Sequence, residues 1–232
     1  MNARLYADDE ELFRLVQTEL FTAVVGDVLD RLGFTRQFLP AAIKPLKTTM
    51  KLVGRAMPVL EADFHVDPDE TGKGPLSNRT FGVMLAALDD LKPGEVYIVG
   101  GAKGDYALWG ELMSMRAQAL GAAGAVLNSY TRDTDGILAL DFPTFGTDTY
   151  AQDQGIRGKV VDWRLPVQIG QALVRTGELI IGDRDGVLVV PREAEAEAIA
   201  AAVEKARGEK TVAKAIRAGL SATEAFAKYG IL

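Results

Sequence analysis

The chain has 232 residues, 48% of them hydrophobic and 25% charged, which is the balance of a folded globular protein rather than a disordered one. It contains no cysteine and one histidine, His65, so disulfides, thiolate nucleophiles, cysteine-bound zinc and metal sites with several histidines are excluded. The net charge of −6 argues against a generally basic protein that binds nucleic acid. The lack of a signal-peptide core or an apolar run of transmembrane length predicts a cytoplasmic protein with no membrane partner.

The first part of the chain predicts a helical segment over residues 9–33. Apolar residues recur there at three- and four-residue spacing, Thr22 is placed to restart the helix as an N-cap, and Gly33 is placed to end it. Asp27 and Asp30 lie off the apolar stripe, and a solvated helix face is the simplest interpretation of both.

The middle of the chain alternates between strands and helices. The pattern predicts a strand at 52–60, a long polar loop at 61–80, a short helix at 81–91, a strand at 95–99, a helix at about 110–120 and a strand at 124–128. The glycine-rich stretch after the second strand lacks both G-x-G-x-x-G and the Walker sequence GKS/T, so it does not support a nucleotide site. A helix between two apolar strands favours a parallel crossover.

The last third of the chain is predicted to be strand-rich and then helical. The expected elements are strands within 158–169, 178–181 and 186–190, a helix from Pro191 to about Arg207, and a last helix that opens with a capping box at Ser221 and closes at Gly230. Two Asp-x-Asp-Gly stretches, at 133–136 and 183–186, begin like calcium loops but lack the later ligands, so we interpret both as turns. With no repeat or composition break, we expect one domain over 1–232, with helical arms at about 9–33 and 192–229. The apolar stripes of the helices at 9–33 and 210–229 are expected to need a partner surface.

Two loops carry the candidate site. Gly110–Met113 begins a helix, where free backbone N–H groups favour a carboxylate or phosphate. Arg132 and Asp133 follow the strand at 124–128, at the edge where open α/β sheets place their ligands. Because the crossover returns the chain beside its start, we expect the two loops to lie together, with an arginine for a carboxylate and an aspartate for a hard divalent cation. By residue type alone, a plain surface pair of Arg132 and Asp133 remains the simpler alternative.

With these segments in view, the chain resembles the RraA-like family, which contains the class II 4-hydroxy-4-methyl-2-oxoglutarate aldolases and the regulator of ribonuclease activity A. The resemblance covers most of the chain and rests on residues 25–33 (VGDVLDRLG), 52–56 (LVGRA), 92–96 (KPGEV), 108–112 (LWGEL), 124–126 (GAV), 132–135 (RDTD) and 182–187 (GDRDGV). It implies an α/β fold, a β/β/α sandwich of the swivelling type, assembled as a homotrimer or homohexamer with sites at subunit interfaces.

The resemblance also implies a role for each matching residue. Asp133 would ligate Mg²⁺ or Mn²⁺, Arg132 would bind the pyruvate part of the substrate, and Gly110, Glu111, Leu112 and Met113 would bind the substrate through backbone amides. It implies a metal-dependent carbon–carbon lyase that cleaves a 4-hydroxy-2-oxo acid to pyruvate and a second carbonyl compound, with oxaloacetate decarboxylation as a side activity. A metal-bound water, or Asp27 or Asp30 of a neighbouring subunit, is a candidate for the base that takes the C4 hydroxyl proton.

Two alternatives remain open on the sequence. Lys103 in the glycine-rich loop is the nearest candidate for a Schiff-base mechanism, and a non-catalytic regulator that acts by protein contact is the second class of function. The segment 61–67 and the polar loop after it replace a compact turn that the family usually has, and Asn128–Thr131 also departs from the family pattern. We therefore expect the half of the site that binds the metal and pyruvate to match the family, and the half that selects the rest of the substrate to differ from it. His65 is either a new substrate-binding or base residue, or it has no chemical role.

Overall fold

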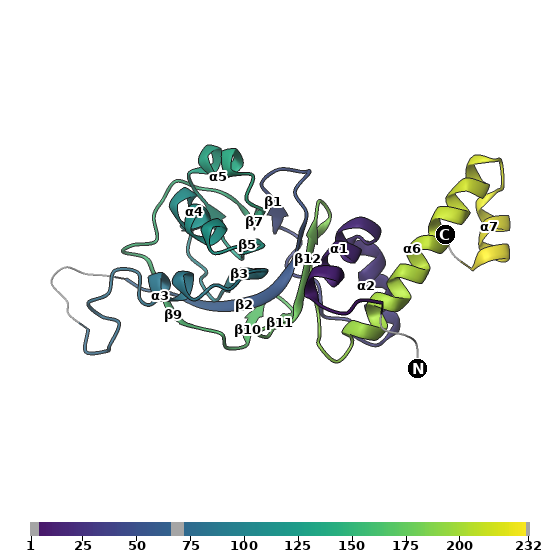
Figure 1. Ribbon diagram of the computed structural model, residues 1–232. Helices are drawn as coiled ribbons and strands as arrows, with labels where there is room; N and C mark the ends of the chain where they lie inside the picture. Colours follow the sequence, from purple (N-terminus) through teal and green to yellow (C-terminus); the bar gives the residue numbers. More distant parts are fainter. Residues whose placement is uncertain (1–4, 66–71, 231–232) are drawn as a thin grey trace.

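The computed structural model describes residues 5–65 and 72–230, and its centre is an eight-stranded sheet (Figure 1). The strands of this sheet are β1 (Lys44–Pro45), β2 (Leu52–Asp63), β3 (Glu95–Gly100), β5 (Gly124–Leu127), β7 (Thr144–Gly146), β9 (Gly158–Trp163), β12 (Leu179–Asp183) and β13 (Gly186–Val190). Their order is β1-β7-β5-β3-β2-β12-β13, with β9 also paired to β2. The strands β2, β3, β5 and β7 run parallel, whereas β1, β9 and β12 pair antiparallel with their neighbours. The predicted α/β class and the parallel crossover are confirmed.

Two small sheets and seven helices complete the described part of the chain. The small sheets are the hairpin of β10 (Val167–Ile169) with β11 (Ala172–Val174), and the parallel set of β4 (Ala107–Trp109), β6 (Tyr130–Thr131) and β8 (Asp148–Thr149). The helices are α1 (Asp9–Glu19), α2 (Thr22–Arg31), α3 (Met84–Asp89), α4 (Glu111–Ala119), α5 (Thr134–Leu140), α6 (Glu195–Arg217) and α7 (Ala222–Tyr229). None of the helices in the described ranges combines the length and the apolar composition that crossing a bilayer requires.

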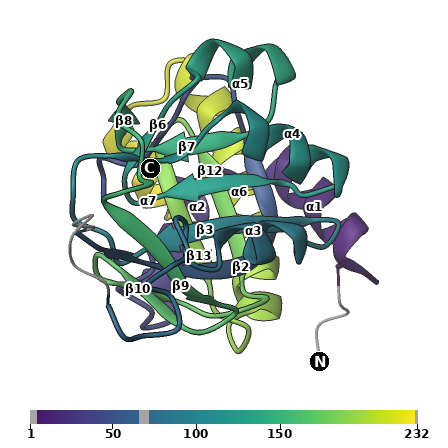
Figure 2. The same ribbon diagram turned by 90° about the vertical axis from the view of Figure 1, so that its left-hand side faces the viewer.

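Alternating side chains of the central sheet form separate cores on its two faces. Tyr97 and Val99 of β3 point toward α3 and α4, whereas Val96 and Ile98 point toward the β10–β11 hairpin. Farther along the sheet, Leu179 of β12 packs against α1, α2 and α6. Figure 2 views the molecule from the side of α3, with α1, α2 and α6 behind the sheet. The sheet is therefore covered by α3 and α4 on one side of β3 and by the β10–β11 hairpin on the other, while α1, α2 and α6 cover the region around β12.

The predicted helical segment at 9–33 forms two helices, and the second begins at Thr22, where a restart was predicted. The prediction that Thr22 caps the second helix is wrong, because Phe21 is its N-cap and the side chain of Thr22 has another partner. Oγ1 of Thr22 donates to Oδ1 of Asp183 at 2.7 Å, and its N–H donates to Oδ2 at 2.8 Å. These bonds fasten the start of α2 to the turn between β12 and β13, which is the turn predicted at 183–186. Gly33, with φ +88°, ends the segment as predicted.

The apolar stripes of α1, α2 and the first half of α6 are covered within this one chain. Leu12, Leu29 and Ile199 are fully buried against each other's helices and the sheet. The expectation that the apolar stripe at 9–33 needs a partner surface is therefore wrong. The helix α6 also runs beyond its predicted end at Arg207, since the residues that follow favour helix and Gly208 alone does not stop it.

The end of the chain projects from the body as an α6–α7 hairpin (Figure 1). The predicted capping box is present: Oγ of Ser221 accepts from the N–H of Glu224, whose carboxylate accepts from the N–H of Ser221 at 3.0 Å. Gly230 closes α7 in the left-handed conformation, with φ +67°. This hairpin, rather than the N-terminal helices, is the arm of the structure.

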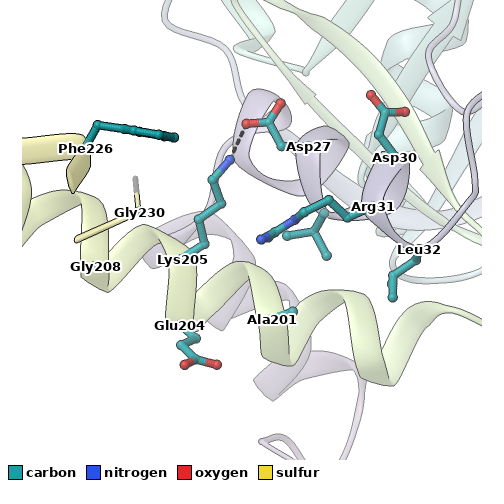
Figure 3. Close-up of a pocket in the computed structure, with 11 residues that line it drawn as sticks. Asp27, Asp30, Arg31, Leu32, Ala201, Glu204, Lys205, Gly208, Phe226 and Gly230 are labelled. Carbon is teal, nitrogen blue, oxygen red and sulfur yellow. Dashed lines mark hydrogen bonds and ion pairs between the residues drawn. The ribbon is translucent and has the colours of Figure 1, made fainter. Parts of the chain in front are cut away.

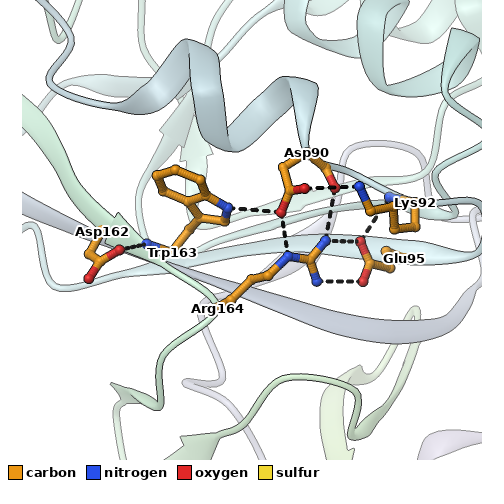
Figure 4. A network of polar contacts seen from close by, with 6 residues as sticks. All are labelled: Asp90, Lys92, Glu95, Asp162, Trp163 and Arg164. Carbon is orange, nitrogen blue, oxygen red and sulfur yellow. Dashed lines mark hydrogen bonds and ion pairs between the residues drawn. The ribbon is translucent and has the colours of Figure 1, made fainter.

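A network of charged side chains joins the connection after β9 to α3 and β3 (Figure 4). Arg164 donates from Nη1 and Nη2 to the two carboxylate oxygens of Glu95, at 2.7 and 2.9 Å, and from Nη2 to the carbonyl oxygen of Asp90 at 2.8 Å. Its Nε and the indole of Trp163 donate to the Asp90 carboxylate. The hydrogen bond from Arg164 is the main cause that holds the pKa of Asp90 well below its usual range. The φ of Arg164 is +60°, which is a costly backbone conformation for a residue other than glycine, so the network stabilises a strained turn.

We expect Arg164→Ala to lower the free energy of unfolding by about 2 kcal/mol at neutral pH. The change leaves the carboxylate of Glu95, which is 13% exposed, without its cation, and leaves the carboxylate of Asp90, which is 33% exposed, with Lys92 alone. Because the pKa of Asp90 is depressed in the folded state, its contribution is full above its unfolded pKa and is lost as the pH falls toward the folded value. Urea unfolding followed by circular dichroism should therefore show a difference between wild type and variant that shrinks in acid. Arg116→Ala, which breaks an exposed pair with Asp89, is the control, and an equal loss in both variants would contradict a special role for Arg164.

Candidate functional site

The structure brings the two predicted site loops together where β4 and β6 end. The N–H of Arg132 donates to the carbonyl oxygen of Trp109 at 2.9 Å. Gly110, the N-cap of α4, lies so close to Asp133 that a β-carbon at residue 110 would be 2.6 Å from Oδ2 of that carboxylate. A side chain at residue 110 would therefore displace the carboxylate, and glycine is what leaves it in place.

Asp133 is the N-cap of α5 and has a left-handed backbone, with φ 55° and ψ 38°. Aspartate is one of the few residue types that tolerate this conformation. The turn predicted at 133–136 is wrong, because the residues after Asp133 form the helix α5 instead. The carboxylate makes no capping hydrogen bond, and its Oδ2 is 3.8 Å from Nε of Arg132. The fold therefore does not use this carboxylate as a cap, and its side chain stays 48% exposed.

Arg132 has a closer acidic partner that the sequence did not reveal. Its Nη1 is 3.1 Å from Oδ1 of Asp153, and its side chain is 39% exposed. The backbone of Asp153 forms an isolated bridge with Ala107 of β4, which places its carboxylate beside the arginine. No local sequence signal predicts this pairing, because it depends on where the segment after β8 returns. Asp153 holds the guanidinium in one orientation and leaves part of it accessible.

A cavity of about 300 Å³ opens beside Arg132, Asp133 and Asp153. Apart from these charged residues and Gln154, its walls come from Phe81, from α3 and β4, and from the start of α4 with its N-cap. These residues are Phe81, Met84, Leu85, Leu88, Ala107, Leu108, Trp109, Gly110, Leu112 and Met113. A second hollow of about 310 Å³, lined by Thr131, Thr134, Thr149, Tyr150 and Ala151, shares Arg132 and Asp133. The two charged residues thus border an apolar chamber and a polar one.

The floor of the apolar chamber is rigid. Trp109 is fully buried between Tyr97 and Phe142, with ring centroids 5.0 and 6.3 Å away. Its indole N–H donates to Oγ of Ser114 at 2.7 Å, and that hydroxyl donates to the carbonyl oxygen of Gly110 at 3.1 Å. These contacts fix the turn from β4 into α4, which is the turn that positions the first amides of the helix.

The first turn of α4 presents backbone donors. The first bond that returns to Gly110 comes from the N–H of Ser114, at 3.1 Å, so the amides of residues 111–113 have no acceptor within the helix. Leu112 and Met113 also line the apolar chamber. The carboxyl of Glu111 lies over α5, where a β-carbon at Gly136 would be 2.3 Å from its Cδ. Its side chain thus leans toward the helix that Asp133 begins.

Asp27 and Asp30 lie in another part of the molecule, on α2. They line a groove of about 820 Å³ between α2, α6 and α7 (Figure 3). Asp27 forms an ion pair with Lys205 of α6, and the side chain of Asp30 is exposed. Within one chain the structure does not bring either aspartate to Arg132 and Asp133.

Lys103 and His65 also lie outside the apolar cavity. The exposed Lys103 uses its backbone N–H to donate to the carboxylate of Asp63, at 3.2 Å. His65 lines a separate hollow of about 420 Å³ with Asp63, Tyr106 and Arg157. Residues 66–71 of the predicted polar loop lie outside the described part of the chain. Within one chain, neither the lysine nor the histidine lines the cavity beside Arg132.

Comparisons with known proteins agree with this architecture. The profile of the RraA-like family, described as Aldolase/RraA, matches residues 22–189. A Halalkalibacterium halodurans protein provisionally named 4-hydroxy-4-methyl-2-oxoglutarate aldolase is 32% identical over 209 residues, which cover 88% of this chain and 89% of that protein.

Two solved structures share the fold. An uncharacterized Pseudomonas syringae protein aligns with a TM-score of 0.82 and 23% identity over 99% of both chains. The Streptomyces coelicolor protein RraAS2, an unusual member of the RNase ES inhibitor RraA family, aligns with a TM-score of 0.74 and 22% identity over 89% of this chain and 97% of its own. The profile match and the 32% identical relative together show that the chain belongs to the Aldolase/RraA family.

Proposed function

We propose that this protein is a divalent-metal-dependent lyase that cleaves a 4-hydroxy-2-oxo acid to pyruvate and a second carbonyl compound. The observation that carries the proposal is the placement of Arg132 and an uncapped Asp133 carboxylate beside the free amides of α4, at the edge of an apolar cavity. The name of the Halalkalibacterium halodurans relative supports an aldolase-type lyase.

The residues around Asp133 fit a Mg²⁺ or Mn²⁺ ion. The carboxylate is a hard oxygen donor that the helix does not use, in a cradle that a β-carbon at residue 110 would fill. Within the described ranges, no three histidine, aspartate or glutamate side chains gather into a complete metal cage. A site with one carboxylate suits Mg²⁺, which commonly keeps waters and substrate oxygens as its remaining ligands. When bound, the ion supplies positive charge against the negative charge that develops on the 2-oxo oxygen.

The chain's own residues bind and orient the substrate. The guanidinium of Arg132, held by Asp153, grips the planar carboxylate of the substrate. As the C3–C4 bond breaks, its electron pair passes toward C3 and negative charge spreads to the C2 oxygen. The amides of residues 111–113 and Arg132 stabilise that charge from fixed positions. The same stabilisation supports loss of carbon dioxide from oxaloacetate, which is the expected side activity.

A test of the function measures pyruvate release in an assay coupled to lactate dehydrogenase. Purified protein is given 4-hydroxy-4-methyl-2-oxoglutarate or oxaloacetate, with Mg²⁺ or Mn²⁺ and with or without excess chelator. Metal-dependent pyruvate release is expected from both. A protein that forms no pyruvate from any 2-oxo acid under these conditions would instead fit the regulator that acts by protein contact.

The base that takes the C4 hydroxyl proton is, in this proposal, Asp27 or Asp30 of a neighbouring subunit in a homotrimer or homohexamer. Asp30 is the preferred candidate of the two, because the carboxylate of Asp27 already pairs with Lys205. We expect Asp30→Asn and Asp133→Asn each to inactivate the enzyme. A co-expressed, equal mixture of the two variants should regain about a quarter of wild-type activity. Each site needs an intact Asp133 from one chain and an intact Asp30 from its neighbour, and random assembly supplies both in about a quarter of the sites.

Light scattering gives the matching measurement of assembly. The mass expected for the wild type is three or six times the 24.9 kDa of one chain. The same mixture made with Asp27→Asn shows which aspartate is shared. A fully active monomer, or a mixture with no recovered activity for either aspartate, would contradict a base from the neighbouring chain.

A further inference from the structure

We infer that the substituent at C4 of the substrate, which remains on the second carbonyl compound, is apolar. The preferred substrate is then a 4-hydroxy-2-oxo acid that carries an alkyl or aryl group at C4 rather than a group with a second carboxylate. The inference rests on the proposed lyase function and names the substrate class of that same site. It follows from the uneven distribution of charge around the cavity beside Arg132.

One end of the cavity is polar and the rest is apolar. Arg132, Asp133 and Asp153 form the polar end, where the proposed reaction places the pyruvate unit. Beyond it, α3 and α4 supply a wall of large apolar side chains. Met84 and Leu88 are 7% and 6% exposed and form its depth.

The opening of the cavity is also apolar. Leu85 and Leu112 are 61% and 78% exposed while they line the cavity, so these leucines stand at its rim. A hydrocarbon group that moves from water into this chamber contacts the buried apolar wall and also shields the exposed leucines from water. A charged group there would lose water without gaining a partner.

Within one chain, a second substrate carboxylate has no free cation to meet at this cavity. Among the described residues that line the cavity, Arg132 is the one cation; it is bound by Asp153 and is assigned to the first carboxylate. The amide of Gln154 is 3% exposed, and its Nε2 points to Sδ of Met84 at 3.2 Å. Arg116, the other cation of α4, pairs with Asp89 at 2.8 Å and does not line the cavity. A distal carboxylate would instead face Asp153 and the apolar wall.

The first experiment compares substrates with the wild-type protein. Four 4-hydroxy-2-oxo acids that carry a methyl, a propyl, a phenyl or a carboxymethyl group at C4 are assayed for pyruvate release with Mg²⁺. We expect kcat/KM to rise about fourfold for each methylene that the cavity buries. The carboxymethyl substrate should be slower than the propyl substrate by at least about tenfold, because its charge is desolvated without a partner.

The second experiment moves a cation to the rim. Leu112→Arg is expected to fold, because that side chain is largely exposed, and to raise the carboxymethyl-to-propyl ratio of kcat/KM by about tenfold or more. Leu112→Gln tests the loss of the leucine without a charge. Met115→Arg, on the same helix but outside the cavity, should leave the ratio unchanged.

The outcomes separate the inference from the function on which it rests. If no substrate yields pyruvate, the proposed function fails. If pyruvate forms and the wild type prefers the carboxymethyl substrate, the function stands and the inference is overturned. The inference is also overturned if Leu112→Arg changes the mass seen by light scattering without changing the ratio, since the apolar rim would then be a contact between copies of the chain.

Discussion

Asp133→Asn is expected to lower kcat/KM for pyruvate release by at least about a thousandfold, which corresponds to about 4 kcal/mol of transition-state stabilisation. The reason is that Asp133 supplies the anionic oxygen proposed to hold the divalent ion, and this chain has no cysteine and no second histidine to replace it. Asparagine tolerates the left-handed conformation that Asp133 adopts, with φ 55°, so the backbone at the start of α5 should be unchanged. The variant thus removes the charge and keeps the shape.

Asp135→Asn is the matched control for this variant. It removes a carboxylate from the exposed first turn of the same helix, outside both hollows that Asp133 lines. Circular dichroism and thermal unfolding should be similar for the two variants, while only Asp133→Asn loses activity. Excess chelator should inactivate the wild type to the same extent, with recovery when Mg²⁺ or Mn²⁺ is returned. Full turnover in chelator, or an active Asp133→Asn, would remove the metal from the proposal.

The part of the site that the sequence predicts is the part that topology determines. A helix between the strands at 95–99 and 124–128 favours a parallel crossover, and β3 and β5 do pair in parallel. That crossover returns the chain beside its start, which is why Arg132 lies against Trp109 and Gly110. These predictions succeed because they need only the order of the elements and the handedness of their connection.

The parts that the sequence does not predict depend on partners far along the chain. Threonine is a residue type that often forms an N-cap, yet the hydroxyl and the N–H of Thr22 donate to the carboxylate of Asp183, which is 161 residues away. The strands β6 and β8 are two residues each, too short to carry a periodic pattern, and exist through pairing in the small sheet. Asp153 reaches Arg132 in the same way, through the position of its backbone beside β4.

The polar loop predicted at 61–80 shows how an irregular segment is held. Its described part leads to Phe81 and α3, which line the apolar cavity. Lys159 of β9, only 2% exposed, donates from Nζ to the carbonyl oxygens of Leu76 and Ser77, at 2.7 and 3.0 Å. The ammonium also lies 4.1 Å from the ring centroid of Phe64. A buried lysine that satisfies loop carbonyls has no sequence signal, although it anchors the segment that enters the cavity.

Arg132→Lys is expected to lower kcat/KM by one to three decades, at about 1.4 kcal/mol per decade. Lysine keeps the positive charge but loses the planar fork that grips a carboxylate with two parallel hydrogen bonds. The guanidinium of Arg132 has several N–H donors: its Nη1 faces Asp153, and its Nε lies 3.8 Å from Asp133. Lysine has a single ammonium in place of these separate donors. A single ammonium cannot hold Asp153 and the substrate in the same geometry.

The way in which activity falls distinguishes substrate binding from a surface ion pair. If Arg132 grips the substrate and also stabilises the charge that develops during cleavage, Arg132→Lys should raise KM and lower kcat together. Asp153→Asn, which only loosens the orientation of Arg132, should have a smaller effect on kcat. Arg116→Lys changes an exposed arginine on α4 that pairs with Asp89, and it should leave both constants unchanged. Values close to wild type for Arg132→Lys would reduce Arg132 to a partner of Asp133 and Asp153, and the proposed carboxylate site would then have to lie at the amides of α4 alone.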